Sequence, residues 1–312
     1  MSEGSAWSVD AYEISIQLRS PKTVIVEGKY DKSLVERVFI ESCVGSRDVV
    51  VDTADMISGD DFSGLGNKDK LISLWSSFAA DIKSSGRIIM ITDREWDGLT
   101  SQDDCVSVTN WVEHTRIGDF QFQTLGHSVE NYGFRLEFIL EYIKHFGCGL
   151  HSHEVESALI RWFPSIVSLA ASFSLESKKR SIINRCGGVF SVDHFIFTEG
   201  VEIAHGMIDS LESRGIQNAG EFIEKVNKLA SEIRANFNAH IHLLAHGHLG
   251  EDLIWATVGA LLKGEGLSTK VCEELAFSRR DERLRFYHGW LSKIDSNERR
   301  PIDELVAIIN FG

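Results

Sequence analysis

The chain has 312 residues, of which 43% are hydrophobic and 25% are charged, and its formal net charge is −14. This composition is typical of a globular protein, and the length predicts two domains. The negative charge opposes general adhesion to nucleic-acid backbones, because such binding depends on Lys and Arg replacing counterions. A nucleic acid therefore needs a local basic patch. Two clusters are candidates, and either could equally be a solvated helix face: Lys178, Lys179, Arg180 and Arg185, and Arg279, Arg280, Arg283 and Arg285.

The cysteine spacing and the N-terminal sequence bear on the cellular location. The five cysteines show no CxxC pairing, which argues against a disulfide framework and against a zinc knuckle. Residues 1–20 lack a basic flank followed by an apolar core, and no run approaches the roughly 18 apolar residues of a membrane span. We therefore expect a cytoplasmic protein with reduced thiols that does not act in a membrane.

Three short apolar runs predict strands in the first half of the chain. They are TVIV at 23–26, VVV at 49–51 and RIIMITD at 87–93. The segments between them carry apolar residues at helical spacing, which predicts one helix over 31–42 and another whose buried face holds Leu71, Ile72, Trp75, Phe78, Ala79 and Ile82. Strands that are apolar at every position and alternate with helices indicate an α/β fold with a parallel sheet flanked by helices.

The second half of the chain is predicted to be mainly α-helical. The clearest helix is AGEFIEKVNKLASEIRANF at 219–237, and HIHLLAHGHLGEDLIWATVGALL at 240–262 predicts a short strand, a loop and a helix that starts near Glu251. We therefore expect a catalytic core over residues 1–133 and a mainly helical domain over residues 134–312. Residues from about 238 to 263 are expected to return a strand and a helix to the core.

Acidic residues follow two of the predicted strands. Glu27 comes directly after TVIV, and Asp93, Glu95 and Asp97 end the run IIMITDREWD. Ligand sites of parallel sheets lie beyond the carboxyl ends of their strands, and acids two apart on an extended segment point to the same side. Crowded carboxylates favour a bound cation, usually Mg²⁺ for an all-oxygen site. The alternative is that Asp93 caps the next turn while Glu95 and Asp97 face water.

These motifs resemble the TOPRIM domain of topoisomerases, DnaG-type primases and OLD-family nucleases. Glu27 and Gly28 match its strand ending in Glu-Gly, and Asp93 and Glu95 match its Asp-x-Asp, with Glu95 in place of the second Asp. The segment TLGHSVENYGF at 124–134 and the later HGHLGEDLIWA are similar to segments of the TOPRIM-like family that includes AriB, the effector of the PARIS anti-phage defence system. The first supplies Ser128, Glu130, Asn131 and Tyr132, and in the second either His248 or Asp252 is the matching polar residue.

The resemblance implies a metal-dependent endonuclease that acts as a toxic effector in anti-phage defence and cleaves tRNA. It implies one or two Mg²⁺ or Mn²⁺ ions, with Glu27 as general acid or base. It also implies an ABC-type ATPase sensor subunit that holds the effector inactive, a phage trigger protein that acts through this ATPase, and a homodimer as the active form. The residue patterns and the resemblance together give these candidate site residues: Glu27, Asp93 and Glu95 for catalysis; Glu27, Asp93, Glu95, Asp97 and Glu130 for the metal; and Lys29, His248, Arg283 and Arg285 for nucleic acid. Lys29 could equally be an exposed lysine at the start of a helix.

Several alternatives remain open at this point. The histidines in HIHLLAHGH at 240–248 suggest zinc, but they suit a hydrogen-bonded core or a nucleic-acid contact equally well. The stretch RLRFYHGWL at 283–291 offers arginines and aromatic rings for unpaired bases, or else is a core-facing helix. The whole chain could also nick DNA, or it could be an inactive TOPRIM fold that serves as a binding or scaffold module.

Overall fold

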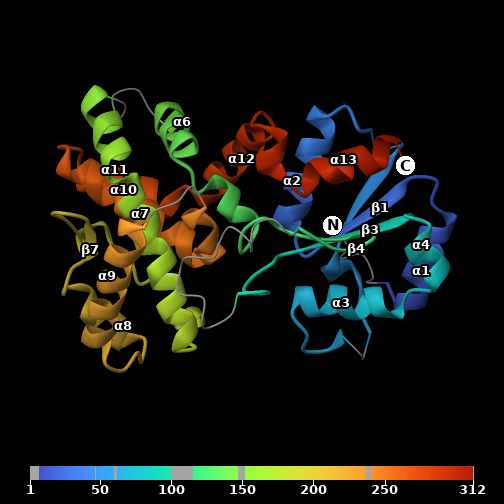
Figure 1. Cartoon of the computed structure of the whole chain (residues 1–312), viewed down its shortest axis with the longest axis horizontal. Helices are drawn as coiled ribbons and strands as arrows, with labels where there is room; N and C mark the ends of the chain where they lie inside the picture. Colours follow the sequence, from blue (N-terminus) through green and yellow to red (C-terminus); the bar gives the residue numbers. More distant parts are fainter. Residues whose placement is uncertain are drawn as a thin grey trace. The chain divides into compact units, whose positions relative to one another are not determined.

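The structure is a computed structural model that describes residues 7–45, 47–59, 62–99, 115–146, 152–236 and 240–311. Its contacts divide the chain into two compact units (Figure 1). The first comprises Met1–Arg94, Glu113–Leu125 and His288–Gly312, and the second comprises Glu95–Val112 and Gly126–Tyr287. This division differs from the expected boundary at residue 133, because residues 126–133 group with the second unit and the C-terminal segment groups with the first.

The first unit is built on a five-stranded sheet, as the α/β prediction requires. The order is β2 (Val49–Thr53), β1 (Lys22–Val26), β3 (Ile88–Thr92), β5 (Gln121–Gln123) and β4 (Arg116–Gly118). All neighbouring strands are parallel except β4 and β5, and Val24 pairs with Val51 on one side and Ile89 on the other. Every residue of β3 is buried, which is what strands covered on both faces predict. The hairpin of β4 and β5 had no clear sequence signal, since each strand has only three residues.

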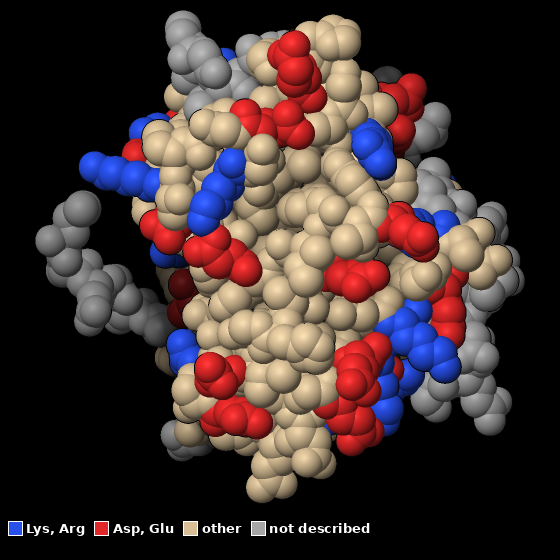
Figure 2. Space-filling model, turned by 90° about the vertical axis from the view of Figure 1, so that its left-hand side faces the viewer, with Lys and Arg blue, Asp and Glu red and all other residues tan. Residues whose placement is uncertain are grey.

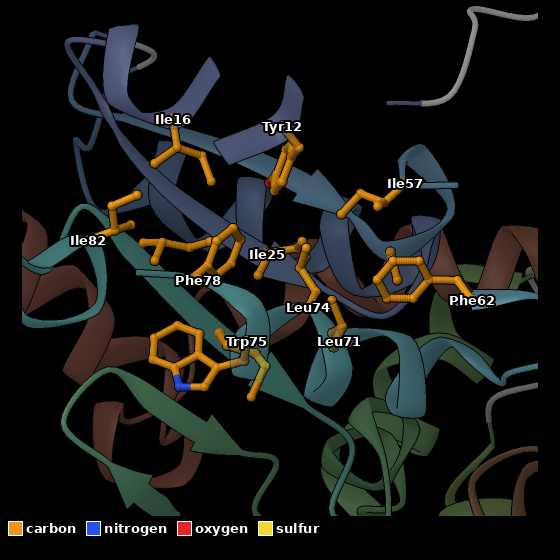
Figure 3. Packing of buried hydrophobic residues seen from close by; sticks show 13 residues of the cluster. Tyr12, Ile16, Ile25, Ile57, Phe62, Leu71, Leu74, Trp75, Phe78 and Ile82 are labelled. Carbon is orange, nitrogen blue, oxygen red and sulfur yellow. The ribbon is translucent and has the colours of Figure 1, made fainter. Parts of the chain in front are cut away.

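Helices cover both faces of this sheet (Figure 1). On one face, α1 (Val9–Leu18), α3 (Asn67–Ser77) and α4 (Ala80–Ser84) pack against Ile25, Ile88 and Met90 (Figure 3). The helix expected to bury Leu71 through Ile82 is therefore two helices, separated at Phe78, whose extended backbone (ψ 142°) ends α3. The break leaves Phe78 and Ile82 in the core, whereas Ile72 is 46% exposed.

The other face carries α2 (Lys29–Glu41), which buries the expected Leu34, Val35, Val38 and Phe39, and α13 (Ile302–Phe311). The ammonium of Lys22, at the start of β1, donates to the carbonyl of Ile308 at 2.8 Å. The C-terminal helix is thus part of the first unit, which no local pattern in the sequence indicated. The short helices η1 (Ala54–Met56) and η8 (Ser296–Arg299) complete the elements described for this unit.

The second unit is mainly helical, as expected. Its longest helices are α7 and α10, both of which are largely buried, and a two-stranded antiparallel hairpin pairs Phe195 with Ile203. The helices and strands are α6 (Leu136–Phe146), α7 (His153–Lys179), α8 (Met207–Ser213), α9 (Ala219–Ala235), α10 (Gly247–Gly264), α11 (Thr269–Glu273), β6 (Phe195–Phe197) and β7 (Val201–Ile203), with short helices η3 (Val129–Gly133), η4 (Ile183–Arg185), η5 (Val192–His194), η6 (Ile241–Leu244) and η7 (Glu274–Ser278). Helix α12 (Arg280–Leu291) starts in this unit and ends in the first.

One predicted element is wrong in type. The strand expected near residue 240 is the 3-10 helix η6, and the following helix begins at Gly247 rather than near Glu251. The buried side chains of η6 (Ile241, Leu243 and Leu244) read as a short apolar run, and such a run does not distinguish a strand from a buried helical turn.

Among the described residues, α7 is the helix that is long and apolar enough to cross a membrane by length and composition. Its most apolar window is 61% buried within the protein, where it packs against α9 and α10. Burial of this kind is characteristic of a core helix, so α7 is weak evidence for a membrane span.

Candidate functional site

Two of the predicted acids meet at the carboxyl edge of the sheet. Glu27 follows the last residue of β1, and Asp93 follows the last residue of the neighbouring parallel strand β3. The backbone N–H of Asp93 donates to Oε1 of Glu27 at 2.8 Å. Parallel strands end at the same edge, so the pairing of β1 with β3 brings these residues together. The carboxylate of Glu27 and the backbone of Asp93 are therefore in contact.

The turn between β1 and α2 is fixed by Asp31. The N–H of Gly28 donates to Oδ2 of Asp31 at 2.8 Å, which caps the helix. The φ of Gly28 is −142°, and a Cβ there would make ordinary contact with Asp31 at 3.5 Å. The fold itself therefore does not require glycine here. Lys29 is exposed at the start of α2, with its ammonium 5.0 Å from the ring centroid of Tyr30.

The segment after β3 is not extended, which corrects the geometric argument for three converging acids. The strand ends at Thr92, residues 95–98 form a turn, and Glu95 has φ 54°, in the left-handed region. Arg94 is only 2% exposed, and its N–H and Nε donate to the hydroxyl and carbonyl of Thr124 at 3.0 and 3.1 Å. This anchor ties the end of β3 to the end of β5.

Within the second unit, the predicted segment at 128–133 folds into η3 and is held by its own polar groups. The N–H of Ser128 donates to Oδ1 of Asn131, and the amide of Asn131 donates to the carbonyls of His242 and Ala245, each at 2.8 Å. Asn131 is fully buried, and so is Tyr132. These residues of the motif therefore join η3 to the segment that precedes α10.

Glu130 is the acidic residue of this motif, and two polar side chains contact its carboxylate. Its Oε2 accepts from Ser128 Oγ at 2.6 Å, and its Oε1 lies 3.1 Å from Nδ1 of His248. Burial raises the pKa of Glu130, but the hydrogen bond and the charge of His248 outweigh it and lower the pKa to about 2. The same contact raises the pKa of His248. Glu130 is thus an ionised acid that already has polar partners within its own unit.

The close approach to Glu130 depends on the glycine that starts α10. A Cβ at Gly247 would clash with Ser128 Oγ and would lie 2.8 Å from Oε2 of Glu130. His246 is the N-cap of the helix, where Nδ1 accepts from the N–H of Leu249 at 3.4 Å. Of the two residues left open by the sequence, His248 is the one that contacts Glu130, whereas Asp252 is half-buried and has its pKa raised by burial.

Arg283 does not lie on the surface, which corrects its prediction as a nucleic-acid contact. The side chain is 2% exposed, donates to the carbonyl of Leu275 at 2.6 Å and pairs with Glu251 at 3.3 Å. Its guanidinium lies 4.8 Å from the ring centroid of Trp255. The adjacent cavity has room for about one water molecule (about 20 Å³), so it is not a substrate pocket. Arg285 is exposed, as a nucleic-acid contact requires.

Most residues of the two basic clusters are paired with acids. The contacts are Lys179 with Glu176, Arg180 with Glu221, Arg279 with Glu274 and Glu282, and Arg280 with Glu251. The face of the molecule in Figure 2 likewise shows acidic and basic side chains interspersed around a central area without coloured charges. The residues drawn in colour on that face do not form the continuous basic track that a long duplex favours.

A cluster around Trp96 was not identified as a site from the sequence. The indole packs edge-on against His127, with ring centroids 4.7 Å apart, and the ammonium of Lys178 lies 4.6 Å from the centroid of Trp96. His127 in turn packs against His246 at 4.4 Å. Each residue stands out in the sequence, since Trp96 interrupts the acidic motif and Lys178 belongs to a basic cluster. Nothing in the sequence indicates that the two side chains are in contact.

Among the described residues, no three His, Cys, Asp or Glu side chains are grouped so that they could hold a metal ion. Two of the histidines suggested as zinc ligands have other contacts: His246 caps α10, and His248 contacts Glu130. These contacts do not support the zinc interpretation. Of the predicted magnesium ligands, Glu27 and Asp93 belong to the first unit, and Glu95, Asp97 and Glu130 belong to the second.

Comparison of the sequence with protein-family models finds no matching family, and comparison with curated proteins finds no similar one.

Proposed function

We propose that the protein is a metal-dependent TOPRIM-type nuclease that acts as a toxic effector in anti-phage defence, with tRNA as its substrate. The observation that carries the proposal is the meeting of Glu27 and Asp93 at the carboxyl ends of neighbouring parallel strands. Ligand sites of open α/β sheets lie at this edge. The resemblance of the two acidic motifs and of the 124–134 segment to the AriB-containing family supports the same activity.

Glu27 and Asp93 carry carboxylate oxygens, the ligand type that Mg²⁺ and Mn²⁺ prefer, and both would hold the ion. The bound ion supplies charge neutralisation at the scissile phosphate and a more acidic water. The amide of Asp93 holds one oxygen of Glu27 and so sets the direction of that carboxylate. Glu27 would then move a proton at the attacking or leaving oxygen.

The choice of tRNA follows mainly from the resemblance. Unpaired loops are recognised by stacking and local charge, whereas duplex DNA favours an extended basic surface, which a net charge of −14 disfavours. The resemblance also assigns an ABC-type ATPase partner that restrains the effector and a homodimer as its active form. Co-expression of the chain with such an ATPase should give one co-eluting peak in size-exclusion chromatography, and separate peaks at every salt concentration contradict this part of the proposal.

A second candidate, an inactive TOPRIM fold used for binding, is favoured by one observation. Among the described residues, no group of three metal-ligating side chains is assembled. The two candidates differ in their response to metal. A working site should raise the melting temperature in Mg²⁺ or Mn²⁺, because an ion that binds only the folded state stabilises it, and a binding module should show no change.

The decisive experiment incubates the protein with Mn²⁺, total tRNA and supercoiled plasmid in one tube and follows both nucleic acids on gels. We expect tRNA cleavage that Asp93→Asn reduces by about 10²-fold or more, the order of the effect of a lost catalytic group. Asp48→Asn is the matched control, because Asp48 precedes β2 and lies at the opposite end of the strands. It should leave cleavage unchanged.

Two outcomes would change the assignment. Plasmid nicking with intact tRNA would make the protein a DNA nuclease of the same metal-dependent type. Undiminished tRNA cleavage by Asp93→Asn would show that the active site does not lie at the carboxyl edge of the sheet. The metal-induced shift in melting temperature should then also be unchanged by the substitution.

A further inference from the structure

The Trp96 cluster lies in the turn that follows the second acidic motif. Trp96 is half-buried, and its ring contacts His127 at the edge while the ammonium of Lys178 lies over it at 4.6 Å. Lys178 is close to the C-terminal end of α7, so an aromatic ring and a cation from distant parts of the sequence form one surface element.

Hydrogen bonds hold this turn in place. The N–H of Glu95 donates to the carbonyl of His127 at 2.6 Å, and the N–H of His127 donates to the carbonyl of Leu243 at 3.2 Å. The N–H of His246, whose ring packs on His127, donates to Ser174 Oγ on α7 at 2.9 Å. The same helix that carries Lys178 is therefore linked to the support beneath Trp96. A preorganised site loses little entropy when it binds.

Lys178 differs from its two basic neighbours in the contact it makes. Lys179 lies 2.8 Å from Glu176, and Arg180 lies 3.6 Å from Glu221. The Lys178 ammonium instead lies over the indole, where partial burial lowers its pKa while Asp97 raises it. An ammonium that is already partly dehydrated has less hydration to lose when it contacts a phosphate.

We propose that Trp96 and Lys178 form a binding site for unpaired nucleic acid, in which a base stacks on the Trp96 indole and Lys178 contacts a phosphate of the same strand. The inference rests on the proposed nuclease function and names the form of substrate that it takes. A cation over an indole contributes about 0.5–1 kcal/mol at an exposed site and about 2 kcal/mol when it is desolvated, whereas a base stacked on an aromatic ring contributes about 1–3 kcal/mol. A base that stacks on Trp96 displaces the ammonium, and the contact of Lys178 with the adjacent phosphate compensates for the cation–π contact that is lost.

The site selects single strands over duplexes. A base in a duplex is already stacked on its neighbours and paired, so its transfer to Trp96 costs a few kcal/mol that an unpaired base does not pay. A purely structural role is the competing explanation, in which Lys178 only shields the indole from water. The two explanations differ in salt dependence, because a phosphate contact releases a counterion and an intramolecular contact does not.

The test measures binding of fluorescein-labelled RNA by anisotropy, with the full chain in EDTA so that metal-dependent cleavage does not occur. The probes are a 12-nucleotide single strand and its duplex. We expect Trp96→Ala to weaken single-strand binding about 5- to 100-fold, which corresponds to the stacking of one base, and Trp96→Phe to keep part of it. Lys178→Ala should reduce the slope of log K against log salt by about 0.7.

Two matched controls are available in the same unit. Trp162 is also half-buried and lies under a cation, with Arg161 4.7 Å from its ring centroid. Trp162→Ala and Lys179→Ala should leave single-strand affinity and salt slope unchanged. Circular-dichroism melts of every variant separate loss of binding from loss of fold.

Three results overturn the inference: equal affinity of wild type and Trp96→Ala for the single strand, equal affinity of wild type for single strand and duplex, or no binding at all. None of them decides the nuclease function, which the tRNA cleavage assay tests in the presence of Mn²⁺. Cleavage that survives with Trp96→Ala at unchanged affinity removes the stacking site and leaves the nuclease in place.

Discussion

The two units each contain a predicted functional glutamate, and they hold it by different means. In the first unit, Glu27 accepts a hydrogen bond from the backbone amide of Asp93. In the second, Glu130 accepts from Ser128 and faces His248, a side chain that can itself be charged. An amide orients a carboxylate, and a protonated histidine can also balance its charge. From the proposed function we expect Glu27 to serve a ligand from outside the chain, whereas the contacts of Glu130 join parts of its own unit.

Substitution of each glutamate in turn tests this difference most directly. Glu27→Gln should lower tRNA cleavage by about 10²- to 10⁴-fold, as loss of a proton-transferring group does, and should leave the melting temperature nearly unchanged. Glu130→Gln should instead lower the free energy of unfolding by about 1–2 kcal/mol, because the ion pair with the partly exposed His248 is lost. Cleavage assays and thermal melts of both variants give the result. The reverse pattern would assign catalysis to Glu130.

The first unit also contains a buried acid whose partners are side chains of the same unit. In the first unit, buried Asp52 accepts from the hydroxyl of Tyr12 at 3.0 Å and pairs with Arg19. Asp52→Ala should lower the free energy of unfolding by about 3 kcal/mol, since it leaves the buried Tyr12 hydroxyl without this acceptor. Urea denaturation measures the loss. The exposed Asp81→Ala is the control and should change stability by less than about 1 kcal/mol.

The third prediction concerns the packing around Glu130. Gly247→Ala should cost about 1–3 kcal/mol, because its methyl group would displace Ser128 and Glu130. Gly264→Ala, at the other end of α10, is the matched control: nothing lies within 4 Å of a Cβ there, so the change should be neutral or slightly stabilising. Equal effects of the two substitutions in urea denaturation would show that α10 does not need close contact with Glu130.

A smaller effect is expected from His246, whose titration should make the stability of the protein depend on pH. Burial, and then the charge of His248, lower the pKa of His246 from 6.5 to about 4. The folded protein keeps His246 neutral, so its contribution is fully present above pH 6.5 and is lost as pH falls towards 4. Between pH 8 and pH 5 this loss amounts to about 1–2 kcal/mol.

His246→Asn tests this dependence, because Asn retains an N-cap acceptor and does not titrate. The variant should lose less stability than wild type between pH 8 and pH 5, measured as the shift in urea midpoint. The exposed His205→Asn should behave as wild type. A parallel decline of all three proteins would mean that other groups cause the acid sensitivity.

Local sequence determined the strands that position Glu27 and Asp93. The apolar runs at 23–26, 49–51 and 88–92 are strands of a sheet covered on both faces, which buries nearly every residue of such a run. Once these strands are parallel, Glu27 and Asp93 must lie at one edge of the sheet, and the pairing of β1 with β3 then brings them together. The stripe at 219–235 predicted α9 for the same reason, since the spacing of its apolar residues is helical.

Tertiary structure decided the features that depend on partners distant in sequence. Arg283 reads as a surface cation, yet Glu251 and Trp255 surround it in the core. The left-handed turn at Glu95 is held by His127, and Lys178 reaches Trp96 from another helix. Periodicity records which face of an element is buried, because burial acts on each residue locally. It does not record which side chain meets which, because that depends on how separate elements pack.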